Sequence, residues 1–224
     1  MTMKDAIAIV DDDEAVRDSL SMMLSNHGFG VCSFLSADAF LALLSADNLP
    51  SCLVCDIRMP GISGMELQRD ISKKWPMIPI VLITGHGDVS IAVSALKAGA
   101  HDFVEKPFSP DRLIDSIKSA IDQTVYKRNQ DQEIVRLSAR IGELSERQRQ
   151  VMNLAVQGLS NKEIALSLKI SPRTVETYRA WVMEKTGARN IADLVRIAMR
   201  LEENDYSTRP RLRSSGAFED DQSL

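Results

Sequence analysis

The sequence predicts a doubly wound α/β domain with a five-stranded parallel sheet, joined by a helical linker to an all-α domain of four helices. Two observations support this prediction. In the first half of the chain, short apolar runs alternate with amphipathic stretches of helical period, which is the order that builds a parallel sheet with right-handed crossovers. After residue 144 the strand-like runs stop and only helical patterns follow.

Each expected strand is short, apolar and bounded by Gly, Pro, Asp or Ser, which is typical of a strand buried on both faces. The five strand segments are Ala6–Val10, Gly30–Phe34, Cys52–Cys55, Ile80–Thr84 and Asp102–Glu105. A helical pattern follows each of them, and these five segments are Glu14–Asn26, Ser36–Ser45, Gly64–Lys74, Val89–Ala98 and Pro110–Asp122.

Residues 124–143 are expected to form a helical linker, because apolar residues recur there at spacings of three and four over less than two heptads. The apolar residues are Ile134, Leu137 and Ile141, and Leu144 continues the spacing at the start of the next domain. This seam could pair with its copy in a second chain, or it could pack on its own domain. Residues 144–201 should form the four-helix domain, and residues 202–224 should be a disordered tail.

Charge differs between the two halves of the chain. Residues 1–122 hold ten Lys and Arg against seventeen Asp and Glu, whereas residues 145–201 hold ten against five. Only the second part is therefore expected to meet a polyanion. No apolar run approaches the roughly 18 residues of a membrane span, and the polar start argues against a signal peptide. A cytoplasmic protein without membrane contact is expected.

Cys52 and Cys55 have the spacing of a metal-binding or redox pair. They fall within one strand, where residues three apart point to opposite faces. We therefore expect two buried core cysteines and no shared metal or disulfide.

Acidic residues end two of the expected strands. Asp11 and Asp12 follow the first strand and Asp56 follows the third, so their carboxylates should converge at one edge of the sheet. A hard divalent cation, Mg²⁺ or Mn²⁺, would relieve their repulsion and suit phosphoryl transfer. A carboxylate in this position can be the nucleophile. Thr84 ends the fourth strand and Lys106 follows the fifth, and both side chains carry groups that can bind a phosphoryl oxygen.

These segments resemble the receiver domain of two-component response regulators over residues 4–123. The matching motifs are Val10-Asp11-Asp12, Asp56-Ile57-Arg58-Met59-Pro60-Gly61, Thr84-Gly85 and Lys106-Pro107-Phe108. The resemblance implies a flavodoxin-like fold with Asp56 as phospho-acceptor. It also implies that Asp12, Asp56 and the Arg58 carbonyl bind Mg²⁺ directly and Asp11 binds it through water. Thr84 and Phe103 match the switch pair, and Lys106 matches the phosphoryl-binding lysine.

The basic domain resembles a LuxR/NarL-type helix-turn-helix domain. The matching motifs are the segments 144–147, 158–165 and 171–177. The outward face of the third helix could enter the major groove of DNA. The resemblance places Glu176, Thr177 and Ala180 at base-reading positions, on the same face as Thr174. Phosphate contacts are assigned to Lys162, Arg173, Arg179 and Lys185.

Together the domains resemble regulators of the NarL/FixJ class, and residues 84–89 and 171–176 favour its FixJ branch. The resemblance implies a transcriptional activator, possessing no enzyme activity beyond its own phosphorylation and slow autodephosphorylation. The implied partners are a sensor histidine kinase, promoter DNA, RNA polymerase and a second copy bound through residues 89–105. Its target genes would serve nitrogen fixation or microaerobic growth.

Two other functions remain open at this point. The chain could be an aspartate-nucleophile phosphatase, because Asp11-Asp12-Asp13 contains a D-x-D motif. It could also be a DNA-binding regulator that does not depend on phosphorylation.

Overall fold

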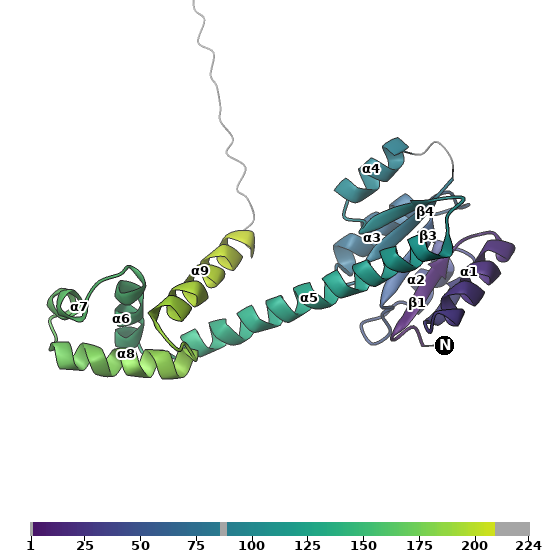
Figure 1. The fold of residues 1–224 in the computed structure, drawn as a ribbon. Coiled ribbons are helices and arrows are strands. Elements are labelled where there is room, and N and C mark those ends of the chain that lie inside the picture. The colour runs from purple at the N-terminus through teal and green to yellow at the C-terminus, as the bar shows by residue number, and fades with distance from the viewer. Residues whose placement is uncertain (1, 86–88, 209–224) are drawn as a thin grey trace, which may run out of the picture. The chain divides into compact units, whose positions relative to one another are not determined.

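A computed structural model of the chain describes residues 2–85 and 89–208. The chain divides into two compact units, the first ending at Asn129 and the second beginning at Gln130 (Figure 1). Within the described residues, no helix is both long enough and apolar enough to cross a membrane.

The first unit contains a five-stranded sheet in which all neighbouring strands are parallel. Its strands are β1 (Ala6–Val10), β2 (Gly30–Phe34), β3 (Cys52–Asp56), β4 (Ile80–Thr84) and β5 (Asp102–Glu105). Their order in the sheet is β2-β1-β3-β4-β5, which is the flavodoxin-like order. The predicted fold class is confirmed, and β3 includes Asp56, one residue more than expected.

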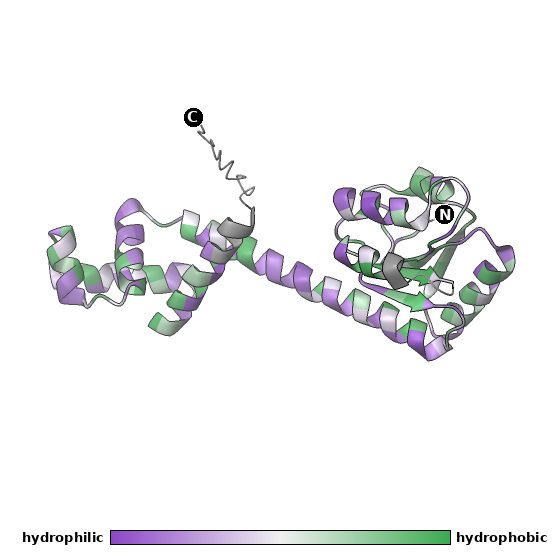
Figure 2. Cartoon of the chain, turned by 90° about the horizontal axis from the view of Figure 1, so that it is seen from above, coloured by the Kyte–Doolittle hydropathy of each residue, from purple (hydrophilic) through white to green (hydrophobic). Residues whose placement is uncertain are grey.

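Helices cover both faces of this sheet. The helices are α1 (Glu14–Asn26), α2 (Ala37–Leu43), α3 (Gly64–Lys74), α4 (Val89–Lys97) and α5 (Pro110–Gly142). Apolar side chains of α1 and α5 pack on one face of the sheet, and those of α2, α3 and α4 pack on the other. Figure 2 shows the strands between them as hydrophobic, as burial on both faces requires.

The two cysteines of β3 lie in different cores, as predicted. Cys52 packs in the core shared with α1 and α5, and Cys55 packs in the core shared with α2, α3 and α4. Both thiols are free and buried. Burial raises the pKa of Cys52 to about 12, so this thiol stays neutral and contributes to packing.

The second unit contains α6 (Glu146–Val156), α7 (Asn161–Leu168), α8 (Pro172–Thr186) and α9 (Ile191–Thr208). Serine side chains cap the first three of these helices. A left-handed residue, Lys169, ends α7 before the turn into α8. Ile164 of α7 and Val175 of α8 are fully buried together with Val151 of α6. This packing fixes the angle of α8 within the domain.

Helix α5 is longer than the sequence predicted. A helix over 110–122 and a separate linker were expected, but α5 runs without interruption from Pro110 to Gly142. The physical reason is that no Gly or Pro lies between these two residues.

The apolar seam of the expected linker packs inside the second unit. Leu137 is buried, and Ile141 packs against the core that contains Leu144. Arg200 of α9 also pairs with Glu133 at 3.3 Å. Of the two alternatives for the seam, the structure therefore favours packing on its own domain.

Helix α9 continues to Thr208, beyond the expected end at Leu201. Its physical reason is that no helix-breaking residue follows before Pro210. Residues 202–208 of the expected disordered tail are thus helical, and the remainder of the tail lies outside the described residues.

Candidate functional site

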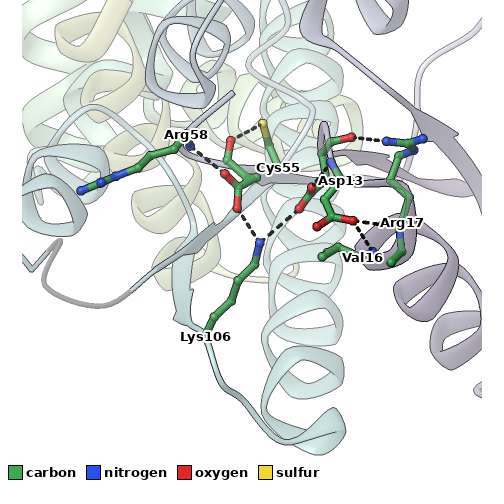
Figure 3. Close-up of polar contacts among 9 residues, drawn as sticks. Asp13, Val16, Arg17, Cys55, Arg58 and Lys106 are labelled. Atoms are coloured by element: carbon green, nitrogen blue, oxygen red, sulfur yellow. Dashed lines mark hydrogen bonds and ion pairs between the residues drawn. The ribbon is translucent and has the colours of Figure 1, made fainter. Parts of the chain in front are cut away.

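Two buried carboxylates lie at the carboxyl edge of the sheet, on the neighbouring strands β1 and β3. Asp56 ends β3 and is 9% exposed, and Asp11 follows β1 and is 2% exposed. Lys106 places Nζ between them, 2.6 Å from Asp56 Oδ1 and 3.2 Å from Asp11 Oδ2 (Figure 3). Asp56 Oδ2 accepts a hydrogen bond from the backbone N–H of Arg58 at 2.7 Å. These predicted site residues are far apart in the sequence of the first unit, and the parallel sheet brings them together at one edge.

The carboxylate pair and the ammonium carry one net negative charge when all three groups are ionised. Burial alone would lower the pKa of Lys106, but the hydrogen bond and charge of Asp56, together with Asp11, raise it above its ordinary value. Burial raises the pKa of Asp11, although a backbone hydrogen bond and Lys106 oppose this effect. A further cation at this edge would favour the ionised form of Asp11.

The remaining acidic residues of this edge lie differently. Asp12, which follows Asp11 in the chain, is exposed. The Asp13 carboxylate caps α1, because it accepts hydrogen bonds from the backbone N–H groups of Ala15 at 2.9 Å and Val16 at 3.3 Å. In the part of the chain that the structure describes, no group of three or more His, Cys, Asp or Glu side chains is arranged to hold a metal ion. The acidic residues therefore form a close pair, Asp11 and Asp56, with Asp12 beside it.

A glycine that the sequence reasoning missed determines how closely α3 approaches Asp56. Gly64 is the first residue of α3, and its N–H donates to the Ile57 carbonyl at 3.0 Å. A Cβ at this position would lie well under 3.0 Å from the Asp56 carbonyl oxygen, closer than real Cβ atoms come. The available signal was a glycine directly after a serine cap, Ser63, whose capping box with Glu66 starts the helix.

Two further contacts at the site had no sequence signal. Arg17 of α1 donates from Nη1 to the Asp11 carbonyl at 2.8 Å, and Cys55 Sγ donates to the Asp56 carbonyl at 3.2 Å. Both bonds hold the backbone of a carboxylate residue and leave its side-chain oxygens accessible to other groups.

The two residues of the expected switch pair lie on one face of the sheet. Phe103 of β5 aligns with Leu82 of β4, and both belong to the core covered by α2, α3 and α4. Thr84 follows Leu82 by two residues and therefore points to the same face. Thr84 is buried, and Phe103 is half-buried. Thr84 thus lies at the carboxyl edge of the sheet and on the same face as the core that contains Phe103.

In the second unit, α8 has one buried side and one exposed side. Val175 and Val182 are buried against the other helices. Four of the predicted DNA-contacting residues are exposed on the opposite side: Arg173, Glu176, Thr177 and Ala180.

The other predicted DNA-contacting residues are in different environments. Thr174 is half-buried and bonded to the cap residue Ser171. Arg179 is also half-buried, and its Nη1 donates to Asn161 Oδ1 at 2.8 Å. Lys185 donates to the Glu143 carbonyl at 2.9 Å. Lys162 is exposed on α7.

Family comparisons match both units. Residues 7–118 match the response regulator receiver domain, and residues 142–198 match the LuxR family of bacterial regulatory proteins. Residues 86–88, within the stretch that favours the FixJ branch, lie outside the described residues.

Individual relatives match most of the chain. The transcriptional regulatory protein FixJ of Bradyrhizobium diazoefficiens is 48% identical over 200 residues, covering 89% of this chain and 97% of FixJ. The response regulator protein TmoT of Ectopseudomonas mendocina is 40% identical over 198 residues, covering 88% of this chain and 90% of TmoT.

Solved structures agree with these sequence matches. The response regulator StyR matches with a TM-score of 0.72 at 38% identity, covering 87% of this chain and 98% of StyR. Full-length FixJ from B. japonicum matches with a TM-score of 0.56 at 47% identity, covering 90% of this chain and 99% of that one. The chain therefore belongs to the FixJ class of two-component response regulators, in which a receiver domain precedes a LuxR-type DNA-binding domain.

Proposed function

We propose that this protein is a cytoplasmic transcriptional activator that is switched on when a sensor histidine kinase phosphorylates Asp56. The observation that carries the proposal is the position of the Asp56 carboxylate, at the end of β3 and 2.6 Å from Lys106 Nζ. Asp56 would be the nucleophile, because it is the strand-end carboxylate that contacts both the ammonium and the Arg58 backbone N–H.

In the transfer step, an oxygen of Asp56 attacks the phosphorus of a phosphohistidine. The O–P bond forms as the P–N bond breaks, and the histidine nitrogen keeps the electron pair of that bond. Lys106 would then bind a phosphoryl oxygen instead of Asp56 Oδ1, and the Thr84 hydroxyl would donate to another. The activity of the chain itself is limited to this step and to slow autodephosphorylation.

A divalent cation fits the donors at this edge. They are oxygen atoms, and the carboxylates of Asp11 and Asp56 exceed the single ammonium by one charge. Asp12, Asp56 and the Arg58 carbonyl would hold Mg²⁺ or Mn²⁺ directly, and Asp11 would hold it through water. When bound, the ion neutralises charge on the phosphoryl oxygens.

The output would be promoter binding through α8 and recruitment of RNA polymerase. Glu176, Thr177 and Ala180 would contact bases, because they lie on the exposed side of α8. Lys162 and Arg173 are exposed and suited to phosphates, and Arg179 would reach a phosphate from its position beside Asn161. The resemblance to the FixJ branch implies genes of nitrogen fixation or microaerobic growth as targets.

Phosphorylation would promote dimerisation through residues 89–105. Two apolar side chains of α4 support this surface, since Val93 is 45% exposed and Leu96 is 41% exposed. In a dimer the second contact with DNA becomes intramolecular, which raises the affinity for paired half-sites. Phe103 would turn inward as Thr84 moves toward the phosphoryl group.

The phosphatase alternative is disfavoured by the position of Asp13. The second acid of the D-x-D motif would have to face the reaction, but its carboxylate caps α1. A regulator that does not depend on phosphorylation would not explain the contacts among Asp11, Asp56 and Lys106.

The test is the intact mass of the protein after incubation with Mg²⁺ and acetyl phosphate. The wild type should gain one phosphoryl group, Asp56→Asn should gain none, and the exposed control Asp47→Asn should behave as wild type. Phosphorylation of Asp56→Asn at the wild-type rate would refute the assignment.

A further inference from the structure

Trp181 exposes a large aromatic surface on α8, where the proposed DNA contacts lie. Its side chain is 45% exposed, and its neighbours on the exposed side of the helix are polar or small residues. We propose that Trp181 is a base-contacting residue that reads the methyl group of a thymine in the major groove. The inference rests on the proposed function of α8 in DNA recognition.

The helix period places Trp181 beside the base-reading positions. It follows Thr177 by four residues and Ala180 by one, so its Cβ lies one turn further along the same exposed side. Arg179, which faces α7 through its bond to Asn161, marks the opposite flank of α8. Trp181 therefore extends the proposed reading surface along the flank that faces away from α7.

Tyr178 restricts the position of the indole. The two rings are in edge-to-face contact, with centroids 5.7 Å apart and planes at 66°. Tyr178 itself packs against the core of Val151, Ile164 and Val175. The exposed indole is thus supported by the domain core before DNA arrives, which lowers the conformational entropy lost on binding.

The chemistry of the major groove selects the ligand for such a group. The thymine methyl is the apolar feature that base pairs present there, and donors and acceptors make up the other features. Trp181 offers apolar surface and no charge, whereas exposed basic side chains such as Lys162 and Arg173 are suited to the phosphates. Contact with a methyl group would also remove apolar surface of Trp181 from water.

The experiment uses the full chain, incubated with Mg²⁺ and beryllofluoride, and a pool of random-sequence DNA duplexes. Duplexes enriched by the wild type define a consensus, and each of its thymines is then replaced singly by uracil, which lacks only the methyl group. We expect one such position per half-site to weaken wild-type binding about fourfold, the effect of losing one buried methyl group. Trp181→Ala should bind the thymine and uracil duplexes equally.

Two variants control for folding and for general loss of apolar surface. Trp181→Phe keeps an aromatic ring and should retain part of the thymine preference. Met199→Ala removes an apolar side chain of α9 that is 55% exposed, and it should keep the full wild-type ratio.

Two results would overturn the inference in distinguishable ways. If Trp181→Ala keeps the wild-type ratio of thymine to uracil affinity, Trp181 reads no methyl group, while the function of α8 stands. If the wild type enriches no sequence at all, the proposed reading of DNA by α8 fails, and the role of Trp181 fails with it.

Discussion

Replacement of Gly64 by alanine adds one methyl group where α3 begins, against the backbone of Asp56. The new Cβ would lie 3.0 Å from both the Asp56 carbonyl carbon and Ile57 Cα, and still closer to the Asp56 carbonyl oxygen. Ordinary contact begins at 3.4 Å, so the two carbon contacts alone require α3 or the end of β3 to move by about 0.4 Å, and the closer carbonyl oxygen requires a larger movement. All of these neighbours are backbone atoms, which cannot move aside as a flexible side chain can.

The expected cost of Gly64→Ala is about 2 kcal/mol of unfolding free energy for the first unit. Overpacking costs about 1–3 kcal/mol, and the better helix propensity of alanine offsets up to about 1 kcal/mol. Phosphorylation from acetyl phosphate should slow about tenfold or more, because displacement of Asp56 separates its carboxylate from Lys106 Nζ.

Urea unfolding followed by Trp75 fluorescence measures the first unit, in a Trp181→Phe background that removes the other tryptophan. Gly30→Ala is the matched control within the first unit, because a Cβ there meets no atom closer than 3.7 Å. It should leave stability unchanged or increase it by up to about 1 kcal/mol. If Gly64→Ala resembles Gly30→Ala in both stability and phosphorylation rate, the steric reasoning is wrong.

Three further predictions concern other contacts. Arg112→Met should cost the first unit about 1 kcal/mol, because half-exposed Arg112 bonds the carboxylate of Asp102 and the carbonyl of Phe103. Burial would raise the pKa of Asp102, but its bonds with Arg112 and Ser116 lower it. The loss of stability in Arg112→Met, measured from urea midpoints, should therefore be complete above a pH of about 4, the pKa of Asp in the unfolded chain. It should disappear as the pH falls through the lower pKa of Asp102 in the folded protein. Asn161→Ala frees Arg179 and should cost the second unit about 1 kcal/mol in thermal unfolding, and an unchanged melting temperature would refute this role. Leu137→Ala should cost about 2 kcal/mol, whereas Val135→Ala, at a position 67% exposed, should cost under 0.5 kcal/mol; equal urea midpoints would contradict the packing of α5.

The elements of the sheet were predictable because the strands are short apolar runs that end at turn-forming residues, and the central strands β1, β3 and β4 are buried throughout. Asp56 and Lys106 could be assigned to one edge because parallel strands place their carboxyl ends together. The sequence did not show how the roles of Asp11, Asp12 and Asp13 differ. Adjacent acids in the sequence differ fully in environment, with Asp11 buried, Asp12 exposed and Asp13 capping α1.

Contacts between side chains of different helices and strands could not be predicted from the sequence pattern. The periodicity of α8 predicted an outward face that is only partly exposed, because Thr174 and Arg179 are half-buried. It also could not show that Arg179 bonds Asn161 or that Lys185 bonds the Glu143 carbonyl. The close approach of Gly64 to Asp56 depends in the same way on where α3 docks on the sheet. The length of α5 was missed because a change from apolar to polar composition does not interrupt a helix.

The course of α5 determines where this protein can be divided into pieces. A fragment that began at Leu144 would contain all of α6 to α9 but would lack Leu137 and Ile141, which the second unit buries or packs. It would also lose the ion pair between Glu133 and Arg200. Chimeras that exchange output domains between relatives should therefore be joined near Asn129, where one compact unit ends and the next begins. The joint then falls inside a helix, so insertions and deletions there would shift the helical phase of all residues that follow.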